Sequence, residues 1–306
     1  MYISDNFFEL NDTISTWVQE NKPFSLVRID NTAGYVLDCI SKGTLPVKQF
    51  FNENTLIEAG INPRSMDYVY SYVYPETIKA MKNSDILGFV DISGDISRNA
   101  EFLSQFPNKP IFYSGHTYHV LDPGLLVGEA EVGYVENPWT QYLKGKKVLV
   151  ISSHYESIMS QWEKMDLVWG QKKDKIVPFD LVGCIRSPYH PILDDRQYPG
   201  CNTFEKLLDY TKKEIDKYDY DVLLTSVSHQ SPFYSDYAKQ QGKIGIQTGG
   251  ILQLYFGIKG NRWTQNIGYA KWQEMFNEHW IYPLEVDAPQ RRKEFSFLET
   301  TFAYWG

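Results

Sequence analysis

Cysteine is scarce in this chain of 306 residues, and its spacing argues against two classes of protein. Cys39, Cys184 and Cys201 lie far apart, and no pair of them forms a C-x-x-C motif. Disulfide-stapled secreted domains and zinc clusters depend on repeated, closely spaced cysteines. The pattern therefore disfavours both classes and fits a reducing compartment.

Long apolar runs and blocks of basic residues are missing as well. No apolar stretch approaches the roughly 20 residues that span a bilayer, and the start of the chain, MYISDNFFEL, does not resemble a signal peptide. We therefore expect a soluble, cytoplasmic protein without a membrane span. The net charge is −8, and no cluster of Lys and Arg makes a nucleic-acid footprint. DNA and RNA polymers are thus not expected partners.

Several enzyme motifs are also missing from the sequence. It has no recognisable hydrolase elbow, H-E-x-x-H helix, P-loop or G-x-G-x-x-G turn. These absences argue against hydrolases, metalloproteases, NTPases and dehydrogenases.

What the chain does contain is an alternation of short apolar runs and longer amphipathic runs. This pattern is typical of repeated βα units, so we expect an α/β, Rossmann-like fold with a mostly parallel sheet and helices on both faces. The expected strands are residues 25–29, 86–92, 110–113, 147–152, 176–182, 221–225 and 243–246. The expected helices are residues 13–20, 32–41, 75–81, 156–162, 204–218, 234–241, 251–256 and 269–276, with Thr203 as an N-cap.

We expect residues 1–306 to form one domain. A central loop insertion is expected at about residues 123–142, where glycines and a proline interrupt the periodic pattern. The segment from about residue 283 to residue 306 reads as an extended wrap that docks Phe302, Tyr304 and Trp305 onto the body.

The most informative stretch is residues 245–263, GIQTGGILQLYFGIKGNRW. An expected strand stops at Gln247 and Thr248, and the pair Gly249 and Gly250 allows a sharp turn and a close backbone approach. A helix-like run follows at once, which is the arrangement of a phosphate cradle. Two cations, Lys259 and Arg262, come within a few residues and suit phosphate contacts. The alternative is a glycine-rich turn with two solvated cations.

The same stretch resembles the C-terminal signature of a known family, GG-x-x-Q-x-x-FGI-x-G-x-RW, in which Gln253 holds the glutamine position. Shorter matches follow the same order along the chain, at residues 24–29 and 31–32, 137–139 and 143–151, 156–158 with 161, and 304–305. The family resembled is a GT-D-type glycosyltransferase-like family associated with polysaccharide biosynthesis. The resemblance implies a Rossmann-like domain that uses a nucleotide-diphosphate sugar.

One departure from that family concerns metal binding. The resembling sequences usually show Gly-Asn-Thr-Glu, or Asp-x-Glu in a metal-binding branch, where this chain has Asp30-Asn31-Thr32-Ala33. Ala33 cannot ligate Mg²⁺ or Mn²⁺, which prefer oxygen ligands. We therefore expect no metal site and no required cofactor. Mg²⁺ or Mn²⁺ remains an alternative, as an ion that binds without being required.

Polar residues follow most of the expected strands, at the edge where ligands bind in open parallel sheets. Together with the residues around the glycine turn, they make up the expected substrate-binding set. That set is Arg28, Asn31, Thr32, Ser153, His154, Glu156, His229, Gln247, Thr248, Gly249, Gly250, Gln253, Lys259 and Arg262.

For single members of this set, structural roles are open alternatives. Arg28 could pair with an internal carboxylate, and His154 and Glu156 could cap the helix that they open. The D-x-D-like run at residues 219–221 precedes its strand, so it lies at the wrong edge of the sheet and reads as a solvated turn.

The sequence thus predicts a glycosyltransferase that moves a sugar from a UDP- or GDP-linked donor to a hydroxyl of a glycan acceptor. Asp91, Asp95 and Asp30 are the candidate catalytic bases, because a carboxylate can take the proton of the attacking hydroxyl. The alternative is a non-catalytic nucleotide- or glycan-binding protein derived from such an enzyme. A phosphosugar hydrolase would need a metal cluster or nucleophile motif that the sequence does not show.

Overall fold

The computed structural model describes residues 2–4, 6–29, 73–90, 100–114, 136–188, 203–265, 270–290, 293 and 303–305. Its centre is an eight-stranded sheet with the strand order β1-β4-β3-β2-β8-β7-β5-β6, in which every pairing is parallel. The strands are β1 (Tyr2–Ser4), β2 (Phe24–Ile29), β3 (Ile86–Val90), β4 (Pro110–Ser114), β5 (Lys147–Ser152), β6 (Asp180–Arg186), β7 (Val222–Ser226) and β8 (Ile244–Gln247). The expected α/β, Rossmann-like fold is confirmed.

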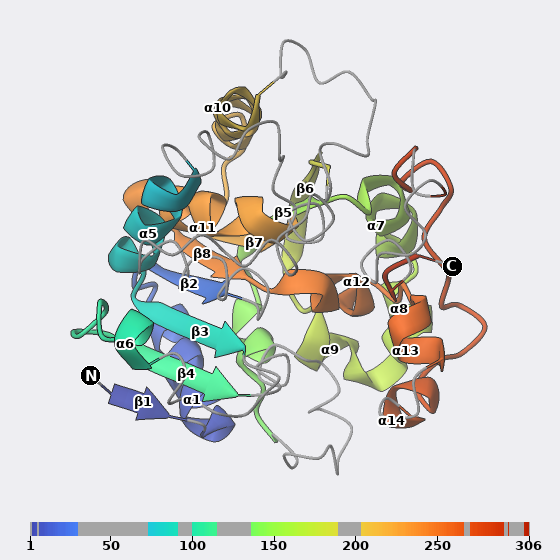
Figure 1. Cartoon of the computed structure of the whole chain (residues 1–306). Coiled ribbons are helices and arrows are strands. Elements are labelled where there is room, and N and C mark those ends of the chain that lie inside the picture. The colour runs from blue at the N-terminus through green and yellow to red at the C-terminus, as the bar shows by residue number, and fades with distance from the viewer. Residues whose placement is uncertain are drawn as a thin grey trace.

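Helices cover both faces of the sheet (Figure 1). One face carries α1 (Phe7–Gln19), the 3₁₀ turn η4 (Trp139–Leu143), α7 (Tyr155–Trp162), α8 (Met165–Trp169), α9 (Lys173–Ile176) and α12 (Leu252–Tyr255). The other face carries α5 (Tyr74–Asn83), α6 (Ala100–Leu103), α10 (Phe204–Ile215) and α11 (Ser231–Gln240). Short turns η5 (Gly170–Lys172), η7 (Ser228–Gln230) and η8 (Gly249–Ile251) connect elements, and α13 (Asn261–Gln265) and α14 (Ala270–Gln273) follow near the C-terminus.

The helices form where the sequence offers an apolar stripe and a cap. In α1 the buried residues Leu10, Ile14 and Val18 recur every fourth position, so one face of the helix packs on the sheet. The side chain of Asn6 accepts hydrogen bonds from the first free N–H groups of this helix. The Thr203 hydroxyl does the same for α10, as expected from the sequence.

One expected strand is wrong. Residues 176–182 were expected to form a strand, but Ile176 ends α9, and the strand β6 runs from Asp180 to Arg186. Both regions are apolar, and a short apolar run does not by itself distinguish a helix end from a strand. The shift matters for function because it places Arg186 at the carboxyl end of the sheet. The edge strand β1 was not expected at all.

Candidate functional site

The carboxyl ends of the central strands form the candidate site, because the helices that follow neighbouring strands there pack on opposite faces of the sheet. After β8 the chain enters α12 on one face, and after β7 it enters α11 on the other. The helix α7, which follows β5, packs on the same face as α12. Neighbouring strands whose helices leave to opposite faces open a crevice between them, and such crevices bind ligands in α/β sheets.

Arg28, at the end of β2, rests against the glycine turn that follows β8. The residue is 7% exposed, and its backbone N–H donates to Oε1 of Gln247 at 2.9 Å. Gly249 has φ of 69°, and a Cβ at this position would lie 2.9 Å from Cζ of Arg28. Only glycine satisfies both conditions, since it tolerates positive φ and leaves room for the guanidinium. The sheet thus fixes a cation directly on the predicted cradle.

The neighbouring polar residues of β7 and β8 have partners within the fold. Thr248 donates its hydroxyl to the carbonyl of Thr225 at 3.1 Å and is fully buried. His229 is also buried, with Nε2 2.9 Å from Oγ1 of Thr77, whose own hydroxyl donates to the carbonyl of Val73. The histidine must therefore donate to Thr77, because the threonine proton is already used. These contacts hold the strand ends and α5 in place.

Tyr304 and Trp305, called the aromatic pair below, pack onto the glycine turn from the C-terminal end of the chain. A Cβ on Gly250 would lie 2.2 Å from the Tyr304 ring, so the ring occupies the space that the missing side chain leaves. Arg262 donates through Nη1 to the Tyr304 hydroxyl at 2.8 Å, and Gln253 donates through Nε2 to the Tyr304 carbonyl at 3.5 Å. The glycine turn and the C-terminal aromatic residues thus form one structural unit.

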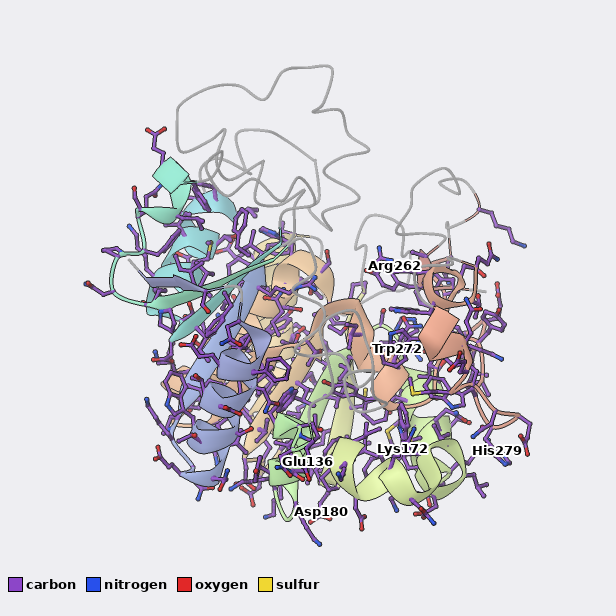
Figure 2. All side chains as sticks on the ribbon, turned by 90° about the horizontal axis from the view of Figure 1, so that it is seen from below. Glu136, Lys172, Asp180, Arg262, Trp272 and His279 are labelled. Atoms are coloured by element: carbon purple, nitrogen blue, oxygen red, sulfur yellow. The ribbon has the colours of Figure 1, made fainter. Side chains whose placement is uncertain are left out.

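Figure 2 shows Arg262 on α13, well apart from Asp180. Asp180 is the first residue of β6 and thus marks the amino edge of the sheet. Lys259 has a different surrounding: its Nζ lies 5.2 Å from the ring centroid of Tyr282, and its N–H donates to the carbonyl of Ile281. Of the two cations predicted beside the turn, the structure thus connects Arg262 to it through Tyr304 and directs Lys259 to Tyr282.

His154, directly after β5, lies under the second member of the aromatic pair. It is 4% exposed, and its ring stacks on Trp305 with centroids 4.5 Å apart. Burial lowers the pKa of His154 to about 4, although the charge of Asp287 and a hydrogen bond from the ring to the Tyr304 backbone favour the protonated form. The imidazole is therefore neutral at pH 7. Among the described residues, Nε2 of His154, Oγ of Ser153 and Nε1 of Trp305 have no hydrogen-bond partner.

Asp287 closes the N-terminus of α7, the helix that His154 and Glu156 were considered to cap. Its carboxylate is fully buried and accepts from the N–H groups of Glu156 and Ser157 at 3.0 and 2.7 Å, and from the Ser157 hydroxyl at 2.6 Å. Arg186 lies 3.4 Å from Asp287 and 3.1 Å from the half-exposed Glu156 carboxylate. The helix end is thus capped by the chain's own carboxylate.

Sequence reasoning missed both Arg186 and Asp287. The apolar run that ends at Arg186 was a usable signal, because an arginine that closes a strand needs a partner or a ligand. Asp287 has no comparable signal, since its helix lies 130 residues away along the chain.

The remaining predicted residues lie outside the described part of the chain. They are Asp30, Asn31, Thr32, Asp91 and Asp95, so all three candidate bases stay predictions. The rejected D-x-D-like run precedes β7, where Asp219 pairs with Lys147 and Asp221 accepts from the Lys147 N–H, as expected for the amino edge.

Two absences within the described residues bear on metal binding and on membrane insertion. No cluster of three or more His, Cys, Asp or Glu side chains suited to a metal ion occurs among them. No helix in the described ranges has the length and apolar character needed to cross a membrane.

Comparison with protein-family models, curated proteins and solved structures finds no match for this chain. The class of the protein is therefore defined by its fold alone, as α/β and Rossmann-like. This fold hosts many unrelated activities, so it does not by itself define a function, which depends on the residues of the site.

Proposed function

We propose that this protein is a glycosyltransferase that binds a nucleotide-diphosphate sugar over the carboxyl ends of β2 and β8. The observation that supports this most is the buried Arg28 guanidinium lying against the left-handed Gly249. A fixed cation beside a glycine turn suits a diphosphate, because arginine forms charge-assisted, bidentate bonds with phosphate oxygens. A local cation also lets a chain of net charge −8 attract an anion, since surface charges are screened beyond about 8 Å at physiological salt.

In the proposed reaction, a hydroxyl of a glycan acceptor attacks the anomeric carbon of the donor sugar. The bond from that carbon to the diphosphate breaks, and a carboxylate base, Asp91, Asp95 or Asp30, takes the hydroxyl proton. Arg28 stabilises the charge that develops on the departing nucleoside diphosphate, the electrostatic role that a metal fills in many related reactions. We propose that this reaction takes place in the cytoplasm and needs no divalent metal.

A panel of nucleotide sugars tests this proposal. Release of UDP or GDP from one donor, with or without a glycan acceptor, would support the enzyme. Binding of the nucleotide without turnover would support the alternative, a non-catalytic nucleotide- or glycan-binding protein, which the alanine at position 33 favours. Absence of both binding and turnover with UDP- and GDP-linked donors contradicts the proposal.

We expect the protein to bind UDP or GDP with similar affinity in the presence of Mg²⁺ and in excess EDTA. The reason is that Arg28 supplies the positive charge, while Ala33 offers no ligand to a metal. Isothermal titration calorimetry under both conditions measures this. Complete loss of binding in EDTA would show that the diphosphate is held through a metal.

The substitution Arg28→Gln should weaken nucleotide binding by about 10- to 150-fold, because a charge-assisted hydrogen bond contributes roughly 1.5–3 kcal/mol. A matched control is Lys147→Gln, which removes an exposed cation from the opposite edge of the sheet and should leave affinity unchanged. Thermal unfolding of both variants shows whether the fold is retained. Equal affinity of a folded Arg28→Gln variant and the wild type would assign Arg28 a purely structural role.

A further inference from the structure

The aromatic pair lies where the proposed donor would bind. Tyr304 fills the space over Gly250 and holds Arg262, while Trp305 stacks on His154. Along the sheet edge these contacts run from the end of β8 to the end of β5, next to the position of Arg28. The chain therefore covers its own candidate site with two of its aromatic residues.

The docked aromatic pair leaves buried polar atoms at this site without hydrogen bonds. Within the described residues, Ser153 Oγ, His154 Nε2 and the Trp305 indole nitrogen are buried without a hydrogen-bond partner. Each unpartnered polar group costs about as much free energy as the burial of one aromatic ring gains. These costs offset part of the free energy that is gained by docking the two rings.

The contacts of the pair also have the chemistry of a nucleotide. Trp305 presents a flat aromatic ring to the His154 imidazole, as a base would. Tyr304 places an oxygen 2.8 Å from the Arg262 guanidinium, as a phosphate would, and its ring uses the close approach that Gly250 allows. A ligand with hydroxyl groups, such as a ribose, could in addition reach the unpartnered Ser153 and His154 atoms.

We propose that Tyr304 and Trp305 are an intramolecular stand-in for the nucleotide, and that a nucleoside diphosphate displaces them when it binds. This inference rests on the proposed function, because it assigns that same site an autoinhibitory cover. The cover keeps the aromatic and cationic groups of the site out of solvent when no donor is bound. Donor affinity is then reduced by the fraction of molecules in which the cover is docked.

The substitution Tyr304→Phe tests this, because it removes only the hydroxyl that occupies Arg262. We expect UDP or GDP to bind at least about fivefold more tightly, at the lower end of the usual coupling between competing events. Tyr282→Phe is the matched control: it removes an exposed tyrosine hydroxyl that contacts Thr264, away from the pair. Its affinity should equal that of the wild type. Equal or weaker binding by Tyr304→Phe overturns the inference.

Hydrogen exchange of the wild-type protein gives a second test that needs no variant. The Asn261 N–H donates to the Trp305 carbonyl at 3.3 Å, so displacement of the pair frees it. Addition of saturating UDP or GDP should therefore accelerate exchange at Asn261, whereas slower exchange would show that the pair closes over the nucleotide and would overturn the displacement. If neither the wild type nor Tyr304→Phe binds any nucleoside diphosphate, the proposed function fails as well. If both bind equally, only the cover fails.

Discussion

Lowering the pH from 6.5 to 4 should weaken the docking of the aromatic pair by up to about 3 kcal/mol. The reason is the buried His154, whose pKa is lowered to about 4 from an ordinary value near 6.5. With the pair released, the imidazole is less buried and its pKa rises toward the ordinary value. With the pair docked, the imidazole stays neutral until about pH 4. The stabilisation is therefore complete above pH 6.5 and is lost as the pH falls through this window, at about 1.4 kcal/mol per pH unit.

The charged group that acts on this imidazole is Asp287, which favours the protonated form and is itself paired with Arg186. Burial outweighs that charge, because it is the largest cause of the lowered pKa. The hydrogen-exchange protection of the Asn261 amide, measured as a function of pH, reports the docking of the pair.

Two variants make this measurement specific to His154. His154→Gln should remove the pH dependence between 6.5 and 4, since an amide does not titrate. His279→Gln changes a partly exposed histidine next to Glu278, and this variant should retain the pH dependence of the wild type. If His154→Gln retains the wild-type profile, another group is responsible.

Asp287→Ala should lower the free energy of unfolding by about 3 kcal/mol at pH 7, because removing one partner of a buried ion pair costs about 3–5 kcal/mol and Arg186 is partly exposed. The carboxylate accepts two backbone N–H groups and one hydroxyl of α7. The alanine would leave these donors without their acceptor and would remove one of the two carboxylates that pair with Arg186. Urea unfolding followed by circular dichroism measures the loss.

Two substitutions separate this effect from a general loss of charge. Asp166→Ala removes a 79% exposed carboxylate that pairs with Lys173 and should change stability by less than about 0.5 kcal/mol. Asp287→Asn keeps the shape and one acceptor oxygen, so it should fall between alanine and the wild type. A loss for Asp287→Ala no larger than for Asp166→Ala would show that the cap contributes little.

The central strands could be predicted from the sequence because both of their faces are buried. In β5 the residues Val148 to Ile151 are fully buried, and polar residues stand at both ends of the strand, so the expected and observed limits agree. The strand β6 could not be placed in the same way, since several of its residues are only partly buried while the preceding Ile176 and Val177 are buried outside it. In this region the hydrophobic pattern indicates which residues are buried, but it does not distinguish a helix from a strand.

The candidate site could be predicted only in part. A charge within an apolar strand pointed to Arg28, and the glycine pair pointed to a close approach at Gly250. The sequence also suggested that Tyr304 and Trp305 dock, and both are buried. It did not show that they dock on the glycine turn itself, or that Asp287 caps α7, because such contacts join segments far apart in the chain without a local pattern.

The pairing of β2 with β8 has a consequence for folding. It joins Phe24 to Ile244, while the other strands pair within two sets, β1-β4-β3-β2 and β8-β7-β5-β6. Contacts between residues so distant in sequence form slowly, because a long loop must close before they contribute free energy. The two half-sheets can therefore form before they join. Arg28 and Gly249 lie on opposite sides of that seam, so a chain whose halves have folded separately already has most of its helices and strands but still lacks the proposed anion site.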